Sequence, residues 1–76
     1  MDLSKYEVEI KRHAFIQASK RGIHPDLIED ALHKGKVEHY GKHGIKIVCK
    51  GRKRTIICVG QIIGTKLKIF TIEGGN

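Results

Sequence analysis

The spacing of the apolar residues changes near Gly35, and few architectures accommodate both of the resulting patterns. Before Gly35, apolar residues repeat at the spacing of one helix face, at Leu27, Ile28, Ala31 and Leu32. After Gly35, apolar residues fall at every second position, the period of a strand with two faces, at Ile45, Ile47 and Cys49. The chain therefore combines helices with a sheet and keeps the two in separate segments.

The N-terminal half predicts one strand and two short helices. Alternating apolar and acidic residues over 6–10 are typical of a half-buried strand. A first helix is expected over 13–21, and Gly22 is suited to end it in the left-handed conformation. A second helix is expected to begin at Pro25, because proline is favoured at the first helical position, and to end before Gly35.

The second half predicts antiparallel strands joined by glycine-containing turns. Strands are expected at 45–50, 54–59 and 67–72, after a β-like stretch that begins at Val37. Turns are expected at Gly41 to Gly44, at Gly51 with Arg52, and around 60–65, where Gly64-Thr65 marks the last turn. The last residues, 73–76, are expected to fray. The prediction is one α+β domain over 1–76. It consists of an N-terminal strand, two helices and an antiparallel β-meander, with both helices on one face of the sheet.

The excess of positive charge is confined to the second half of the chain. The formal net charge is +7, and acidic and basic residues balance one for one through Glu38. Between His39 and Ile72 there is no Asp or Glu. Because concentrated like charge destabilises a compact fold, this segregation favours a polyanionic partner, and RNA is the leading one.

The candidate nucleic-acid-binding residues share this basic half. On alternation, four of them fall on one side of the expected sheet, namely Lys46, Lys50, Lys66 and Lys68. Three more lie at the expected hairpin, namely Arg52, Lys53 and Arg54. A solvated hairpin tip is the simpler interpretation of the latter group, since charged turns are common on protein surfaces.

Other features exclude several function classes. No stretch approaches the roughly 18 consecutive apolar residues of a membrane span, and no signal peptide is evident, so a cytoplasmic protein is expected. Cys49 and Cys58 are expected to be free thiols, because they lack a Cys-x-x-Cys spacing and the chain is expected to be cytoplasmic. The histidines and cysteines lack the paired spacings of a zinc site, and neither a metal nor a cofactor is expected.

Three short motifs carry a family resemblance that extends over nearly the whole chain. They are His13-Ala14, Arg21-Gly22-Ile23, and the apolar stripe 27–32 followed by Gly35. This order resembles a family of small domains of unassigned function that look related to RelE-like and BrnT-like toxins. Relatives often carry a second Arg where this chain has Gln17.

The resemblance implies a RelE-like fold, whose toxin members are mostly ribosome-dependent or free RNA endonucleases neutralised by an antitoxin. Metal-independent cleavage of RNA needs a base, a cation and an acid at the scissile phosphate, and His13 with Arg21 are the catalytic candidates. The competing interpretation is architectural: His13 caps the first helix and Arg21 pairs with an acid of the second. A second alternative is a noncatalytic interaction module whose basic face binds an acidic, antitoxin-like partner.

Overall fold

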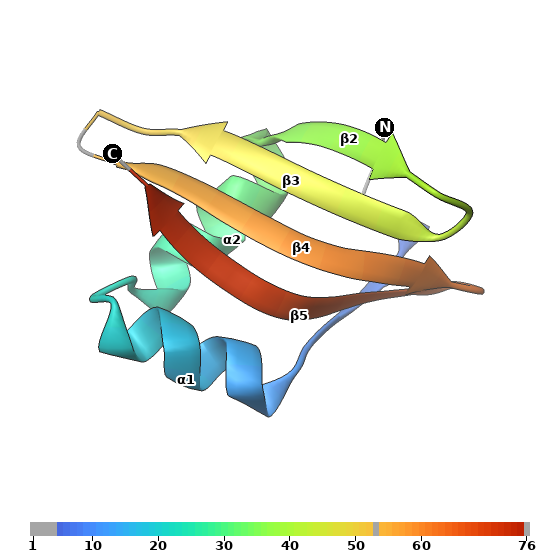
Figure 1. The fold of residues 1–76 in the computed structure, drawn as a ribbon, viewed down its shortest axis with the longest axis horizontal. Coiled ribbons are helices and arrows are strands. Elements are labelled where there is room, and N and C mark those ends of the chain that lie inside the picture. Colours follow the sequence, from blue (N-terminus) through green and yellow to red (C-terminus); the bar gives the residue numbers. More distant parts are fainter. Residues whose placement is uncertain (1–4, 53, 76) are drawn as a thin grey trace.

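The computed structural model describes residues 5–52 and 54–75, which form two helices and a five-stranded sheet (Figure 1). The helices are α1 (Arg12–Lys20) and α2 (Pro25–Lys34). The strands are β1 (Glu7–Ile10), β2 (Lys36–Tyr40), β3 (Gly44–Lys50), β4 (Thr55–Ile63) and β5 (Lys66–Gly75). The predicted α+β class is confirmed.

The sheet is mixed, which corrects the prediction of a simple antiparallel meander. Its strand order is β1-β5-β4-β3-β2. Strands β2 to β5 pair antiparallel with their neighbours in the chain, whereas β1 pairs parallel with β5. A parallel pair requires a long crossover, and here the two helices and three strands lie between its members. Local patterns carry no information about such a distant partner.

Both helices begin and end close to where the sequence predicts. Pro25 occupies the first turn of α2, with Asp26 adding negative charge near the positive end of the helix dipole. Gly22 has a φ of +72°, the left-handed conformation that favours glycine, and it separates the two helices. No helix among the described residues is long and apolar enough to cross a bilayer.

The core is aliphatic and joins residues of both helices with one set of strand side chains. Its helical members are small or branched, namely Ala14, Ala18, Ile28 and Ala31. Its strand members are Ile45, Ile47, Ile56, Cys58, Leu67, Ile69 and Ile72, and Ile23 joins from the connection between the helices. The alanines let the helices approach the sheet closely, and Figure 1 shows α2 behind β3 and β4.

The last two strands are longer than predicted. The expected connection over 60–65 is wrong in its first part, because β4 continues to Ile63, whereas the expected turn at Gly64 and Thr65 is confirmed. Gly60 lies within β4 at a register irregularity, where a Cβ would collide with the carbonyl oxygen of Lys68. The glycine therefore allows a close approach of two strands, as in a β-bulge. The expected fraying from residue 73 is also wrong through Gly75, since Glu73 pairs with Ile57 and Gly74 with Ile56.

Candidate nucleic-acid interface

The candidate basic residues separate into two groups in space. Lys46, Lys66 and Lys68 lie on strands, on the side of the sheet that alternates with the core residues, here called the outer face. Lys50, Arg52 and Arg54 lie at the hairpin that joins β3 to β4. The remaining candidate, Lys53, lies outside the described residues.

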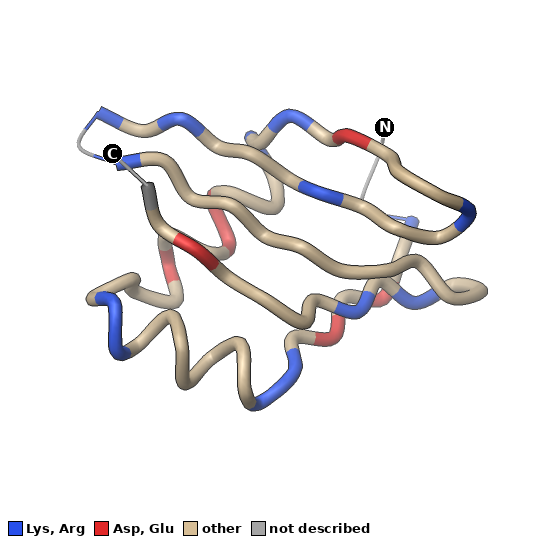
Figure 2. Tube along the Cα trace, in the orientation of Figure 1, with Lys and Arg blue, Asp and Glu red and all other residues tan. Residues whose placement is uncertain are grey.

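The lysines of the outer face each lie opposite a glutamate. The strand register pairs Lys46 with Glu38. It pairs Lys66 with Glu7 and Lys68 with Glu9. Side chains at paired positions share one face of a sheet, so acids from the neutral N-terminal half offset these lysines. The segregation of charge along the sequence is therefore not maintained on this face, where Figure 2 shows acidic segments on the strands beside basic ones.

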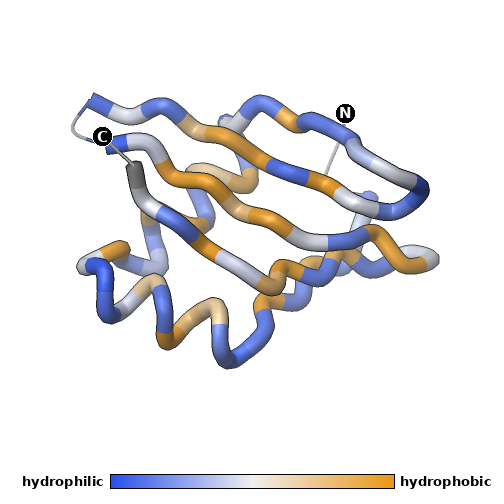
Figure 3. The backbone as a smooth tube through the Cα atoms, in the orientation of Figure 1, coloured by the Kyte–Doolittle hydropathy of each residue, from blue (hydrophilic) through white to orange (hydrophobic). Residues whose placement is uncertain are grey.

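Apolar side chains occupy the middle of the outer face. Val48 pairs with Ile57 across β3 and β4, and Val59 lies on the same side of β4. These three are partly buried, whereas Phe70 is 38% exposed. Figure 3 shows the apolar segments running through the central strands. The outer face is thus a mixed surface rather than a continuous basic one.

The hairpin group lines a groove of about 880 Å³ at one end of the molecule. The groove, here called the hairpin groove, lies between α2 and the hairpin. Its charged lining consists of four cations and one acid, namely Lys34, Lys50, Arg52, Arg54 and Asp30. Its apolar lining includes Leu27, Cys49 and Ile56. Among the described residues, positive charge is therefore concentrated here more than on the outer face.

A series of hydrogen bonds holds the hairpin against the end of α1. The Gly51 amide donates to the carbonyl of Arg54 at 2.9 Å and closes the turn. The Arg54 guanidinium donates to the carbonyl of Arg21 at 3.1 Å, and Arg21 in turn donates to the carbonyl of Ile72 on β5 at 2.9 Å. Figure 2 shows the basic segments of the hairpin and of the end of α1 on the same side of the molecule. These contacts fix the position of the groove wall.

The two catalytic candidates lie at opposite ends of α1. His13 is exposed in the first turn, and its Nε2 lies 3.1 Å from the Nε2 of Gln17, the position where the resemblance expects arginine. Arg21 follows the last turn, about 12 Å farther along the axis at 1.5 Å per residue. The architectural roles suggested by the sequence are not the ones observed: Lys11 is the N-cap of α1, and Arg21 bonds a strand carbonyl rather than an acid of α2. Catalysis by this pair stays a prediction.

Sequence reasoning missed the contribution of α2 to the hairpin groove. Leu27, Asp30 and Lys34 are spaced by three and four residues, so they share one side of the helix. The spacing of these residues is visible in the sequence, but the sequence does not show that the hairpin lies opposite this side of α2. Lys34 belongs to the neutral half of the sequence, and Leu27 belongs to the apolar stripe of the second helix, although its side chain is 41% exposed.

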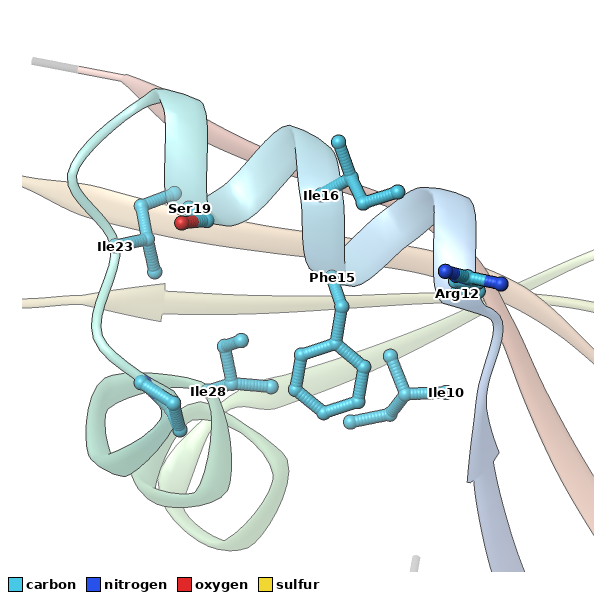
Figure 4. A pocket seen from close by; sticks show the side chains of 8 residues that line it. Ile10, Arg12, Phe15, Ile16, Ser19, Ile23 and Ile28 are labelled. Carbon is cyan, nitrogen blue, oxygen red and sulfur yellow. The ribbon is translucent and has the colours of Figure 1, made fainter.

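A second groove, of about 540 Å³, is predominantly apolar and lies between the start of α1 and the start of α2. In Figure 4 the ring of Phe15 points toward Ile10 and Ile28, while Ile16 points away from them. Phe15 is 42% exposed and Ile16 is 44% exposed. Arg12 is the charged residue of the lining. This apolar groove presents large side chains to solvent on a helix that the core holds only through alanines.

The thiols and histidines form no additional centre in the described part of the chain. No group of three or more His, Cys, Asp or Glu residues is close enough there to hold a metal ion. Cys49 and Cys58 are both free. Burial, and to a smaller extent charge repulsion from the nearby Cys49, raises the pKa of the Cys58 thiol to about 11. Cys58 is therefore a core residue rather than a nucleophile.

Comparisons with protein-family models, with curated proteins and with solved structures each gave no match to this chain.

Proposed function

We propose that the chain is an RNA-binding domain that contacts phosphates through the hairpin groove. The observation that carries the proposal is the convergence of Lys34, Lys50, Arg52 and Arg54 around one groove that contains a single acid. Four cations on a concave surface attract a polyanion, and arginine and lysine both bind phosphate oxygens. The proposal includes a RelE-like architecture in which both helices cover one face of the sheet.

The groove is favoured over the outer face as the contact surface for an electrostatic reason. The outer-face lysines lie opposite glutamates, so an approaching phosphate meets repulsion as well as attraction there. At the groove, the cations outnumber the acid. Binding at the groove releases counterions from the RNA, and the affinity should then fall steeply as salt rises.

Two variants with equal loss of charge test this assignment. The groove variant combines Lys34→Gln, Lys50→Gln and Arg52→Gln, and the control combines Lys46→Gln, Lys66→Gln and Lys68→Gln. Affinity for a short single-stranded RNA is measured at several salt concentrations. With about four phosphate contacts, the slope of log affinity against log salt should be about −3, taking roughly 0.7 per contact. In the groove variant, the magnitude of this slope should be lower by about 2, and in the control the slope should change by less than about 0.5.

Two results would contradict the proposal. Equal effects of the two variants would mean that net charge alone drives binding. An affinity independent of salt would remove phosphate contacts as its basis. Arg54 is left unchanged in the groove variant because its guanidinium also supports the fold through Arg21.

The apolar groove favours a second candidate function, a protein-interaction module. Exposed Phe15 and Ile16 suit an amphipathic helix, with Arg12 contacting an acid of the partner. The test is coexpression with the product of an adjacent reading frame that encodes an acidic, helical protein. Phe15→Ala should abolish copurification of that product, whereas the groove variant should not. Copurification that depends on the hairpin groove instead would reject this assignment.

Metal-independent cleavage of messenger RNA is a further proposal, which rests on His13 and Arg21. Induced expression in a heterologous cell, with growth and messenger RNA integrity followed, tests it. His13→Ala should abolish cleavage with little effect on RNA affinity, because a proton-transfer group acts mainly in the transition state. Since His13 is exposed, the variant should fold normally. Intact cleavage in the variant would exclude His13 as the general base or acid.

A further inference from the structure

The hairpin groove contains more than binding groups for phosphate. Leu27 is 41% exposed, although it belongs to the apolar stripe of α2. It lines the groove together with Cys49 and Ile56. A site for phosphate alone needs cations and amides, and an apolar surface adds nothing to it. A nucleobase, in contrast, has two apolar faces and a polar edge, and it gains from contact with aliphatic side chains.

The groove is also large enough for a complete nucleotide. Its volume of about 880 Å³ lies in the range of roughly 300–1,000 Å³ typical of small-molecule sites. The cations at the hairpin and the apolar residues of α2 and β4 line the same cavity. A single ligand with a charged end and a flat apolar end is therefore matched by both parts of the lining.

Asp30 is the single acid of this basic groove. The Asp30 carboxylate has no ion pair within 4.0 Å among the described residues. The ion pair found there joins Lys11 to Glu9 at 3.6 Å. An ionised carboxylate only accepts hydrogen bonds and can accept two in parallel. Among the four RNA bases, guanine presents two adjacent N–H donors on its Watson–Crick edge, at N1 and N2. Adenine and cytosine present one amino group beside an acceptor, which a carboxylate oxygen repels.

We infer that the hairpin groove binds one unstacked guanine nucleotide of RNA. The guanine lies against the exposed side chain of Leu27 and donates from N1 and N2 to the carboxylate of Asp30. Its phosphate is bound by the cations, principally Lys50 and Arg52. This inference rests on the proposed RNA binding and specifies its substrate class. Because base pairing occupies the Watson–Crick edge, the site selects guanines in loops, bulges and single-stranded ends.

Titration with single nucleotides tests the inference. The full-length protein is titrated with GMP, AMP, CMP, UMP and inorganic phosphate, with amide chemical shifts as the readout. GMP should bind about tenfold more tightly than AMP, within the discrimination expected of a bidentate contact. Asp30→Asn should reduce this ratio to about one. Glu29→Gln, the same charge change on a neighbouring residue of α2 that does not line the groove, should preserve it.

A second variant separates the base contact from the phosphate contact. Leu27→Ala should weaken GMP binding several-fold and leave inorganic phosphate binding unchanged, and the exposure of Leu27 makes misfolding of this variant unexpected. Equal affinity for all nucleotides and phosphate would overturn the guanine site. A guanine preference that survives in Asp30→Asn would also overturn it. If the guanine site is overturned by either result but a short RNA still binds with steep salt dependence, the proposed RNA binding stands. If neither RNA nor nucleotides bind, the guanine site and the proposed RNA binding are both rejected.

Discussion

At the residue scale, the structure separates groups that are identical in the sequence. Cys58 is fully buried in the core, whereas Cys49 at the edge of the hairpin groove is only partly buried. The strand register pairs Ile47 with Cys58 and Cys49 with Ile56, so the two thiols are diagonal neighbours across β3 and β4. Diagonal positions lie farther apart than directly opposed ones, which disfavours a bridge between them.

Cys58 should make the fold sensitive to alkaline pH. The unfolded thiol ionises near its ordinary pKa of 9.0, while burial raises the folded pKa to about 11. As pH rises through this interval, the unfolded state loses its proton first, and the contribution of Cys58 to stability, fully present below pH 9, is lost by about pH 11. The loss should be on the order of 2 kcal/mol, at 1.36 kcal/mol per pKa unit.

Urea unfolding of the wild type and Cys58→Ala between pH 8 and pH 11 measures this loss. Every other titratable group is common to both proteins, so the difference between the two curves isolates Cys58. The stability gap between them should narrow as pH rises. Parallel curves would show that the Cys58 thiol ionises equally in both states.

Alkylation at neutral pH should modify Cys49 well before Cys58, because Cys49 is only partly buried and Cys58 is buried.

At the element scale, glycines that look alike in the sequence have different roles. Gly22 and Gly64 have positive φ and end or turn the chain, as their neighbours in the sequence predict. Gly60 instead lies inside β4, where the backbone of β5 approaches too closely for any side chain. Interpreting Gly60 as the start of a loop was reasonable from the sequence, since only the position of β5 distinguishes the two cases.

Replacing Gly60 should therefore be costly. Gly60→Ala places a Cβ against the carbonyl of Lys68, which requires the two strands to separate. The expected destabilisation is about 1–3 kcal/mol, the usual effect of overpacking. Gly74→Ala is the matched control in the same strand pair, since the atom nearest to its Cβ would be the Cδ1 of Ile23, at 3.3 Å. Thermal unfolding of both variants measures the difference, and equal melting temperatures would contradict the close approach.

At the scale of the whole molecule, the distribution of charge differs from its order along the chain. A net charge of +7 on 76 residues causes self-repulsion. Folding relieves part of it by placing Glu7, Glu9 and Glu38 opposite outer-face lysines. The four cations of the hairpin groove retain their mutual repulsion, which only Asp30 offsets within the groove.

Salt should accordingly stabilise the free protein while it weakens RNA binding. Screening the groove cations between about 0.05 M and 0.3 M salt should raise stability by roughly 0.5 kcal/mol, or about 2–4 °C in Tm for a chain of this size. Differential scanning calorimetry of the wild type, the groove variant and the outer-face control checks this. The groove variant should lose most of the salt dependence and the control should keep it. A Tm that falls with salt would indicate that favourable ion pairs dominate instead.

The sequence by itself determined the α+β class, both helices and the two-faced strand β3, because the period of apolar residues reports the local conformation directly. It also determined the left-handed turn at Gly22 and the helix start at Pro25, which depend on the covalent geometry of single residues. Only the tertiary structure decided that β1 lies beside β5, that glutamates lie opposite the outer-face lysines, and that Asp30 and Lys34 meet the hairpin. These relations join residues far apart in the chain, and they are set by packing of the shared core, which no local pattern encodes.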